Sequence, residues 1–194
     1  AIVYSTAAEL DYSRKSESSE DRKRHCDRAD LMTPIVKGWC SEVCQELTSI
    51  GLQIHGGHGY IRETGVEQYV RDARITQIYE GANGIQALDL VGRKIPAHTG
   101  RYLRSFFHPV QSWIEENSVN AELQPFVLPV AKAFGRLQLA TGHIAQAGLG
   151  NPDEGGAAAS EYLRLFVLVA LGYLWDRLAL ISIKIEGEND KSFF

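Results

Sequence analysis

The sequence contains few cysteines and no excess of positive charge, and both shortages limit what the protein can be. Only 3 cysteines occur in 194 residues, and 20 Lys and Arg are outnumbered by 24 Asp and Glu. An odd, small number of cysteines argues against a disulfide framework and is typical of a reducing compartment, so we expect a cytoplasmic protein. The net charge of -4 offers no basic surface for nucleic acid, which we exclude as a partner.

Long apolar runs are also missing. The most apolar run, Leu165–Trp175, lies between Arg164 and Asp176 and is shorter than the ~20 residues that span a bilayer. We therefore predict a helix buried in a soluble core and no transmembrane segment. The chain starts at Ala1 without a signal-peptide pattern, and we interpret it as a piece of a longer protein.

Sustained alternation of apolar and polar residues, which would indicate strands, does not occur in the sequence. Apolar residues instead recur every three or four positions, as in 35–54 and 85–95, and this spacing predicts helices. We predict an all-α protein, with an up-down helical bundle over residues 1–96 followed by a second, appended helical domain over 97–194. Pro96 marks the expected boundary.

Capping and turn residues predict where several helices begin and end. Thr33 and Pro34 predict a helix start, because threonine can cap a helix and proline is tolerated at its first position. We expect the polar residues 13–28 to form a solvated face or a loose loop, and the glycine-rich residues 148–157 to form a loop. Pro109 is expected to kink or end its helix.

Two segments interrupt the helical pattern without an evident structural reason, and both are candidates for chemistry. In the first, Gln53, Ile54 and His55 lead into Gly56 and Gly57. Glycines let a backbone approach a ligand closely and direct N–H groups at a pyrophosphate. A glycine-rich turn after a helix is more often only a C-cap, so both interpretations stay open.

The second segment places Glu80 between two apolar helices and follows it with the short stretch Gly81–Gly84. Partial desolvation of a carboxylate in such a loop would disfavour its charged form and suit it to act as a general base. The alternative is a carboxylate that interacts with the dipole of the helix beginning near Ile85. The residues alone support the two interpretations about equally.

Together, the two segments resemble the C-terminal helical domain of acyl-CoA dehydrogenases. The family pattern is Q-[IV]-x-G-G-x-G-[YF], then R-D-A-[RK]-[IV]-x-x-I-Y-E-G-T and I-Q, and this sequence carries QIHGGHGY followed by RDARITQIYEGANGIQ. Two motifs at the right separation make the resemblance specific over roughly residues 1–95. The rest of the chain resembles a helical domain appended in a long bacterial branch of the family, which includes methylmercaptopropionyl-CoA dehydrogenases.

The resemblance implies an FAD-dependent oxidation of an acyl-CoA thioester to its trans-2-enoyl form, in which a carboxylate removes the α proton. Glu80 stands at the position of that carboxylate, and Gly81 is implied in substrate binding. Two groups of residues are implied in FAD binding. They are Gln53, Ile54, His55, Gly56 and Gly57, facing the FAD of a neighbouring subunit, and Ala82, Asn83 and Gly84, near the flavin of the same subunit.

The resemblance also implies electron-transfer flavoprotein as the acceptor and a homo-oligomer, either a dimer or a tetramer. Relatives complete the flavin pocket with further helical and β-sheet domains, so we expect the chain alone to bind no FAD and to be inactive. One alternative is a metal-dependent hydrolase using His55, His58, Glu63 and Glu80, although no metal site is expected. Another is a catalytically inactive helical assembly module.

Overall fold

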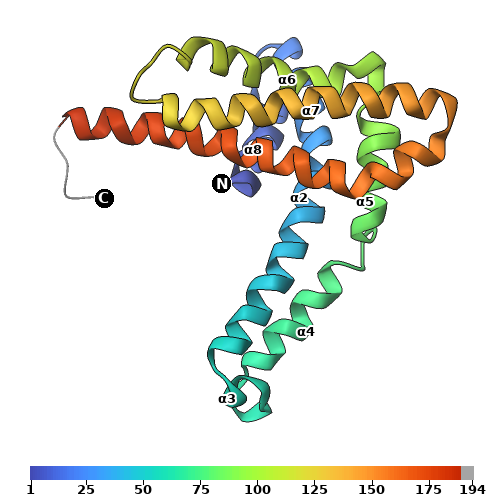
Figure 1. Ribbon diagram of the computed structural model, residues 1–194, viewed down its shortest axis with the longest axis vertical. Helices are drawn as coiled ribbons and strands as arrows, with labels where there is room; N and C mark the ends of the chain where they lie inside the picture. The colour runs from blue at the N-terminus through green and yellow to red at the C-terminus, as the bar shows by residue number, and fades with distance from the viewer. Residues whose placement is uncertain (189–194) are drawn as a thin grey trace.

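The computed structural model describes residues 1–188, and every regular element in that range is a helix. The prediction of an all-α protein is confirmed. The elements are α1 (Ile2–Lys15), α2 (Ser19–Ile54), α3 (Gly57–Tyr60), η1 (Arg62–Thr64), α4 (Val66–Thr76), α5 (Asn83–Asp89), η2 (Leu90–Lys94), α6 (Ala97–Asn117), α7 (Gln124–Gly150) and α8 (Pro152–Glu188). The second half of α2 and the whole of α4 form an arm that projects from the other helices, with α3 at its tip (Figure 1).

Helix α2 begins at Ser19, so the predicted helix start at Thr33 and Pro34 is wrong, and the proline lies inside the helix. Ser18 caps the earlier start, because its hydroxyl accepts two backbone N–H groups of the first turn at 3.2 and 3.3 Å. Pro34 removes one helical hydrogen bond, but its ring is buried in the core. A good cap upstream and burial of the proline therefore outweigh the local start signal.

The polar residues 13–28 are helical on both sides of a short break and mostly exposed, so the expected solvated face is confirmed and the alternative of a loose loop is wrong. Their charges join helices. Arg101 of α6 donates to the buried carboxylate of Asp27 at 2.6 and 3.0 Å, and Arg28 donates to Glu9 of α1 at 2.8 Å. Pairing with Arg101 offsets the cost of burying the Asp27 carboxylate, and these pairs hold the polar stretch against its neighbours.

One hydrophobic core joins the early helices to the late ones. Leu31 and Ile35 of α2 belong to the same buried cluster as Phe134 of α7 and Phe166 of α8. The ring centres of Phe106 and Phe166 lie 4.8 Å apart, within the range for a favourable aromatic pair. The two halves of the chain are therefore packed together, while the predicted division into two domains stays a prediction.

Helix α6 contains a break, but Pro109 does not end the helix. The helix continues through this proline to Asn117, and its only non-helical residues are His98, Thr99 and Gly100, which have positive φ values of 50, 56 and 76°. The predicted boundary at Pro96 thus lies directly before a real interruption. A proline near the middle of a helix is tolerated here because the apolar face around it is buried, with Phe106 and Val110 in the core.

Apart from Asn151, the glycine-rich residues 148–157 are helical, and the loop predicted there is wrong. Helix α7 ends at Gly150 and α8 begins at Pro152, so Asn151 alone separates them. The Asn151 side chain accepts the backbone N–H of Asp153 at 3.1 Å, and proline followed by acidic residues is favourable in a first helical turn. These start signals override the low helix propensity of the glycines.

Helix α8 is long and apolar enough to cross a membrane, over Pro152–Ile185, by length and composition alone. Of the most apolar window, 28% is buried inside the structure, and Phe166 and Val167 are fully buried in the core. Core helices of soluble proteins meet the same criteria of length and composition, so this one helix does not show a membrane span. One side of the helix formed by the predicted apolar run is buried in the core, whereas Trp175 at its end is exposed.

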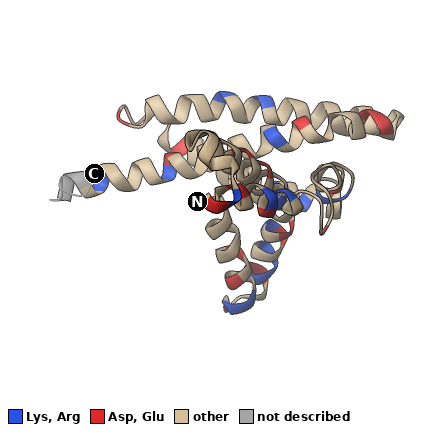
Figure 2. Cartoon of the chain, turned by 90° about the horizontal axis from the view of Figure 1, so that it is seen from below, with Lys and Arg blue, Asp and Glu red and all other residues tan. Residues whose placement is uncertain are grey.

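Charged residues of both signs are mixed along the arm (Figure 2). On α4, Arg71 forms an ion pair with Glu67 one turn earlier at 3.0 Å, and Gln68 donates to Asp72 at 2.6 Å. Exposed pairs of this spacing stabilise a helix by about 0.3–0.5 kcal/mol each. Arg71 and Asp72 thus have local structural partners on their own helix.

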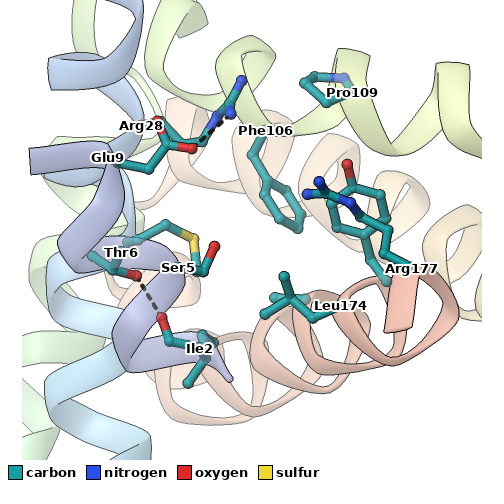
Figure 3. A pocket seen from close by; sticks show the side chains of 12 residues that line it. Ile2, Ser5, Thr6, Glu9, Arg28, Phe106, Pro109, Leu174 and Arg177 are labelled. Carbon is teal, nitrogen blue, oxygen red and sulfur yellow. Dashed lines mark hydrogen bonds and ion pairs between the residues drawn. The ribbon is translucent and has the colours of Figure 1, made fainter. Parts of the chain in front are cut away.

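A small cavity lies where α1, α2, α6 and α8 meet. Figure 3 shows Glu9 and Arg28 paired on one side of it and Arg177 on another. The guanidinium carbon of Arg177 lies 5.6 Å from the centre of the Tyr173 ring. The cavity has a volume of about 40 Å³, far below the ~300–1,000 Å³ of small-molecule sites. We interpret it as a gap in the packing between four helices.

The carboxylate of Asp176 on α8 is buried, with 4% of the residue exposed, and its Oδ2 has no hydrogen-bond partner in the described part of the chain. Burial raises its pKa from 3.8 to about 6. The unfolded chain releases this proton at lower pH than the folded chain, so the charged form costs stability. The free energy of unfolding should therefore fall as the pH rises from about 4 through about 6.

We expect Asp176→Asn to raise the free energy of unfolding by about 2–3 kcal/mol at pH 8, and to change it much less at pH 4, where the wild-type side chain is also neutral. Urea unfolding of both proteins at the two pH values measures the difference. Glu161→Gln, at an exposed position of the same helix, is the control and should show little pH-dependent difference. A gain that is equal at pH 4 and pH 8 would contradict this account of Asp176.

Candidate functional site

The link between α4 and α5 holds Glu80 in a left-handed turn. The φ angle is 54° at Glu80 and 85° at Gly81. A left-handed residue other than glycine costs roughly 1–2 kcal/mol, and such conformations cluster at functional sites. A Cβ at Gly81 would lie 2.8 Å from Gln86 Nε2, the end of a flexible side chain, so the positive φ is the main reason for glycine at this position.

Residues outside the turn fix its backbone. Gln86 Nε2 donates to the Glu80 carbonyl at 3.0 Å, and Lys37 Nζ of α2 donates to the Gly81 carbonyl at 2.6 Å. The backbone N–H of Asn83 donates to the carbonyl of Gln77 at 3.2 Å, which closes the loop across its base. The turn is therefore held from α2 and from α5 at the same time.

Sequence reasoning assigned no role to Lys37 or Gln86. Lys37 is 44 positions from Gly81 in the chain, so no local pattern connects them. The one signal in the sequence was a lysine within the otherwise apolar stretch Ile35–Trp39 of a helix. Gln86 lies within the matched motif, where its contact with the Glu80 carbonyl explains why an amide stands there.

The expected partial desolvation of Glu80 by its flanking helices is wrong, since the residue is exposed in the described structure. The reason is that α4 and α5 each pack against α2, which leaves the turn between them on the surface. Within residues 1–188, the backbone N–H of Glu80 meets no protein acceptor. Helix α5 has no side-chain cap, so the Glu80 carboxylate does not hydrogen-bond to its first turn.

The glycine-rich segment lies at the tip of the arm. The structure explains why two of its positions are occupied by glycine. Gly56 has φ 57° and ψ -143°, a region that essentially only glycine adopts. A Cβ at Gly59 would lie 2.3 Å from the Leu52 carbonyl oxygen, so this glycine lets α3 approach the end of α2. A Cβ at Gly57 would meet nothing within 4 Å, which leaves its backbone accessible to a ligand.

The structure does not bring the two segments together within one chain. Gln53–Gly57 and Glu80 lie at opposite ends of α4 (Figure 1), and this helix of 11 residues is roughly 16 Å long. His55 and His58 are likewise separated from Glu80. No group of three or more His, Cys, Asp or Glu residues that could hold a metal occurs within residues 1–188. The geometry that the metal-hydrolase alternative requires is therefore not present in this part of the chain.

A polar cavity of about 370 Å³ lies beside the Glu80 turn. Residues of α2, α4, α5 and α8 line it. Asn83 and Gly84 face it from the start of α5, and Ser160 and Arg164 face it from α8. Sequence reasoning placed α8 in a separate domain and gave it no part in the site. The volume of this polar cavity falls within the range of small-molecule sites.

Comparison with protein-family models assigns most of the chain. Residues 6–95 match the family "Acyl-CoA dehydrogenase, C-terminal domain". Residues 106–194 match the family "Acetyl-CoA dehydrogenase C-terminal like". The two matched regions leave a short gap that contains the left-handed residues His98, Thr99 and Gly100.

Several characterised proteins are similar to this chain. The 3-methylmercaptopropionyl-CoA dehydrogenase of Ruegeria pomeroyi is 35% identical over 98% of this chain and 32% of its own length. The caffeyl-CoA reductase-Etf complex subunit CarC of Acetobacterium woodii is 39% identical over 37% of this chain and 18% of its own. The chain thus spans a third or less of the length of these relatives.

A solved structure, that of Caenorhabditis elegans ACDH-11 in complex with C11-CoA, has the same fold over most of this chain. The TM-score is 0.73 with 21% sequence identity, and the match covers 92% of this chain and 30% of that one. At this identity the likeness supports the fold alone. It extends across both halves of the chain, so the packing of α6–α8 against the earlier helices has a counterpart in that protein.

Proposed function

The chain belongs to the acyl-CoA dehydrogenase family, and from this we propose that it is the C-terminal part of an FAD-dependent enzyme that oxidises an acyl-CoA thioester to trans-2-enoyl-CoA. The observation that carries the proposal is the left-handed turn at Glu80, within the motif of Tyr79, Glu80 and Gly81. The backbone of Glu80 is strained and is held from two helices. This suits a carboxylate that must meet a substrate atom in one position.

In this proposal Glu80 is the general base that removes the proton from the carbon α to the thioester carbonyl. Its side chain makes no ion pair within residues 1–188, so the carboxylate is free to accept a proton. Its unpaired backbone N–H can donate to the thioester oxygen, where negative charge develops as the proton leaves. A donor of this kind contributes roughly 10²–10³-fold in rate. Gly81, the next residue, is the proposed substrate-binding residue.

The residues at both ends of the arm fit FAD, and bound FAD would accept the hydride that leaves the β carbon. Near Glu80, Ala82, Asn83 and Gly84 would contact the flavin of the same subunit, Ala82 through its backbone only, because the threonine hydroxyl usual in the family is missing. The accessible backbone of Gly57 suits a pyrophosphate. With Gln53, Ile54, His55 and Gly56, it would contact the FAD of a neighbouring subunit.

The separation of these two groups by the length of α4 supports the assignment to different subunits, and hence a homo-oligomer, either a dimer or a tetramer. The other parts of the flavin pocket would come from the remainder of the longer protein, so the isolated chain is expected to bind no FAD and to have no activity. Electron-transfer flavoprotein is the proposed acceptor, since one relative is named as a subunit of an Etf complex. We place the enzyme in the cytoplasm.

Two substrate classes are compatible with the proposal. One is a linear fatty acyl-CoA, and the other is methylmercaptopropionyl-CoA, which the likeness to the Ruegeria pomeroyi enzyme favours as the specific alternative. A screen of the full-length protein with acyl-CoAs of graded length, including methylmercaptopropionyl-CoA, tests the function. Turnover with one class and formation of its enoyl product supports the proposal. Absence of turnover with every acyl-CoA would favour the inactive assembly module.

A further inference from the structure

The side chain of Lys37 lies where α2 passes the turn that contains Glu80. Its Nζ donates to the carbonyl oxygen of Gly81 at 2.6 Å and to Asn83 Oδ1 at 3.2 Å. The residue is half-buried and forms no ion pair in the described part of the chain. Its charge is therefore directed at the backbone of the turn and not at a carboxylate.

Asn83 completes this contact and connects the turn to α2 at three points. Its Oδ1 accepts hydrogen bonds from Lys37 Nζ and from Ser41 Oγ, the latter at 2.9 Å, and its Nδ2 donates to the carbonyl of Gly38 at 3.1 Å. The three partners occupy one face of α2, at spacings of one helical turn or less. The amide of Asn83 thus uses both of its ends to bind one helix.

The contact matters because the turn is not stable on local grounds. Glu80 and Gly81 both have positive φ, and a glutamate in this conformation persists only where the surroundings determine it. The cation of Lys37 forms a charge-assisted hydrogen bond, which is stronger than a neutral one. Gln86 holds the neighbouring Glu80 carbonyl from the other side. Removing Lys37 would leave the Glu80 and Gly81 carbonyls held from α5 alone, and α2 would be joined to the turn only through the contacts of Asn83 with Ser41 and Gly38.

We propose that Lys37 is a positioning residue, which holds the Glu80–Gly81 turn in its left-handed conformation and so sets the place of the Glu80 carboxylate and backbone N–H. The expected effect on catalysis rests on the proposed function, whereas the contact between Lys37 and the turn does not depend on it. Lys37 touches neither substrate nor the reacting atoms in this account. Its loss should therefore lower kcat and leave KM nearly unchanged, because the base and the N–H donor of the turn act mainly in the transition state, where the proton leaves and negative charge develops.

The test uses the full-length protein and compares Lys37→Met, which keeps the length of the side chain but removes its donors, with Lys37→Arg, whose fork can reach both acceptors. We expect a fall in kcat of roughly 10–100-fold in Lys37→Met, little change in KM, and recovery of most of kcat in Lys37→Arg. Lys132→Met, at an exposed position of α7, is the matched control and should behave like the wild type.

Amide hydrogen exchange of residues 77–84, measured by mass spectrometry, provides a readout that needs no activity. Exchange should be faster in Lys37→Met than in the wild type and normal in Lys37→Arg. Equal exchange and equal kcat in Lys37→Met and the wild type would overturn the inference. Should Lys37→Met fail to fold, Lys37→Gln replaces it with the same criteria. If the wild type has no activity on any acyl-CoA, the proposed function is wrong. The exchange data still decide whether Lys37 holds the turn.

Discussion

Replacement of Glu80 by glutamine in the full-length protein lowers kcat by roughly 10²–10⁴-fold if the carboxylate is the general base. Glutamine has nearly the same shape and keeps the backbone N–H that would donate to the thioester oxygen, but it cannot take up the α proton. The left-handed turn should survive, because it is held by Lys37 and Gln86 through backbone carbonyls and not through the Glu80 side chain. Steady-state turnover with the preferred acyl-CoA measures the loss, and the FAD content and KM should stay near their wild-type values.

Glu63→Gln provides the matched control for this experiment. Glu63 is also an exposed glutamate of the arm, in η1, but it lies near the tip and has no part in the proposed reaction. Its variant should turn over at the wild-type rate. Near-normal turnover of Glu80→Gln would remove the assignment of the base and leave the glutamate as part of a helical module without catalytic function.

The second large effect concerns the core that the two halves share. Phe166 of α8 is fully buried, and its ring centre lies 4.8 Å from that of Phe106 and 6.1 Å from that of Tyr162. Phe166→Ala should lower the free energy of unfolding by about 3–5 kcal/mol, because it removes apolar contacts and leaves a cavity that the surrounding helices fill only in part. Urea unfolding followed by circular dichroism measures the change.

Leu168→Ala is the control for the core substitution, since Leu168 lies on the same helix and is 56% exposed. This substitution should change the free energy of unfolding far less than Phe166→Ala does. Because Leu31 of α2 lies in the same cluster, we also expect Phe166→Ala to unfold the chain in one transition at lower urea. Two separate transitions, with only the later one shifted, would instead show that residues 1–96 form an independent domain.

The sequence predicted the helices wherever an apolar stripe recurred, and it failed where start signals competed. The stripe of α2 was visible, but its true start at Ser19 depends on the Ser18 cap and on pairs such as Asp27 with Arg101, which join positions far apart in the chain. The glycines after Gly150 concealed a helix start, because the capping contact of Asn151 outweighs their low propensity. Long-range pairing and burial decided these boundaries, and neither is readable from a local pattern.

The candidate site was predictable as a pair of motifs but not as a geometry. Glu80 and the segment Gln53–Gly57 stood out as interruptions of a helical pattern. Their placement at opposite ends of α4, and the exposure of the carboxylate, depend on how α4 and α5 pack on α2. Lys37 was missed for the same reason, since its contact with Gly81 exists only when α2 passes the turn.

The most direct test of the central claim is the anaerobic mixing of full-length protein, purified with its FAD, with one equivalent of the preferred acyl-CoA. The account predicts rapid loss of the oxidised flavin absorbance in the wild type, formation of one equivalent of trans-2-enoyl-CoA, and a loss of absorbance slowed roughly 10²–10⁴-fold in Glu80→Gln. Loss of absorbance at the same rate in both proteins, or none in the wild type with any acyl-CoA of the series, would contradict it.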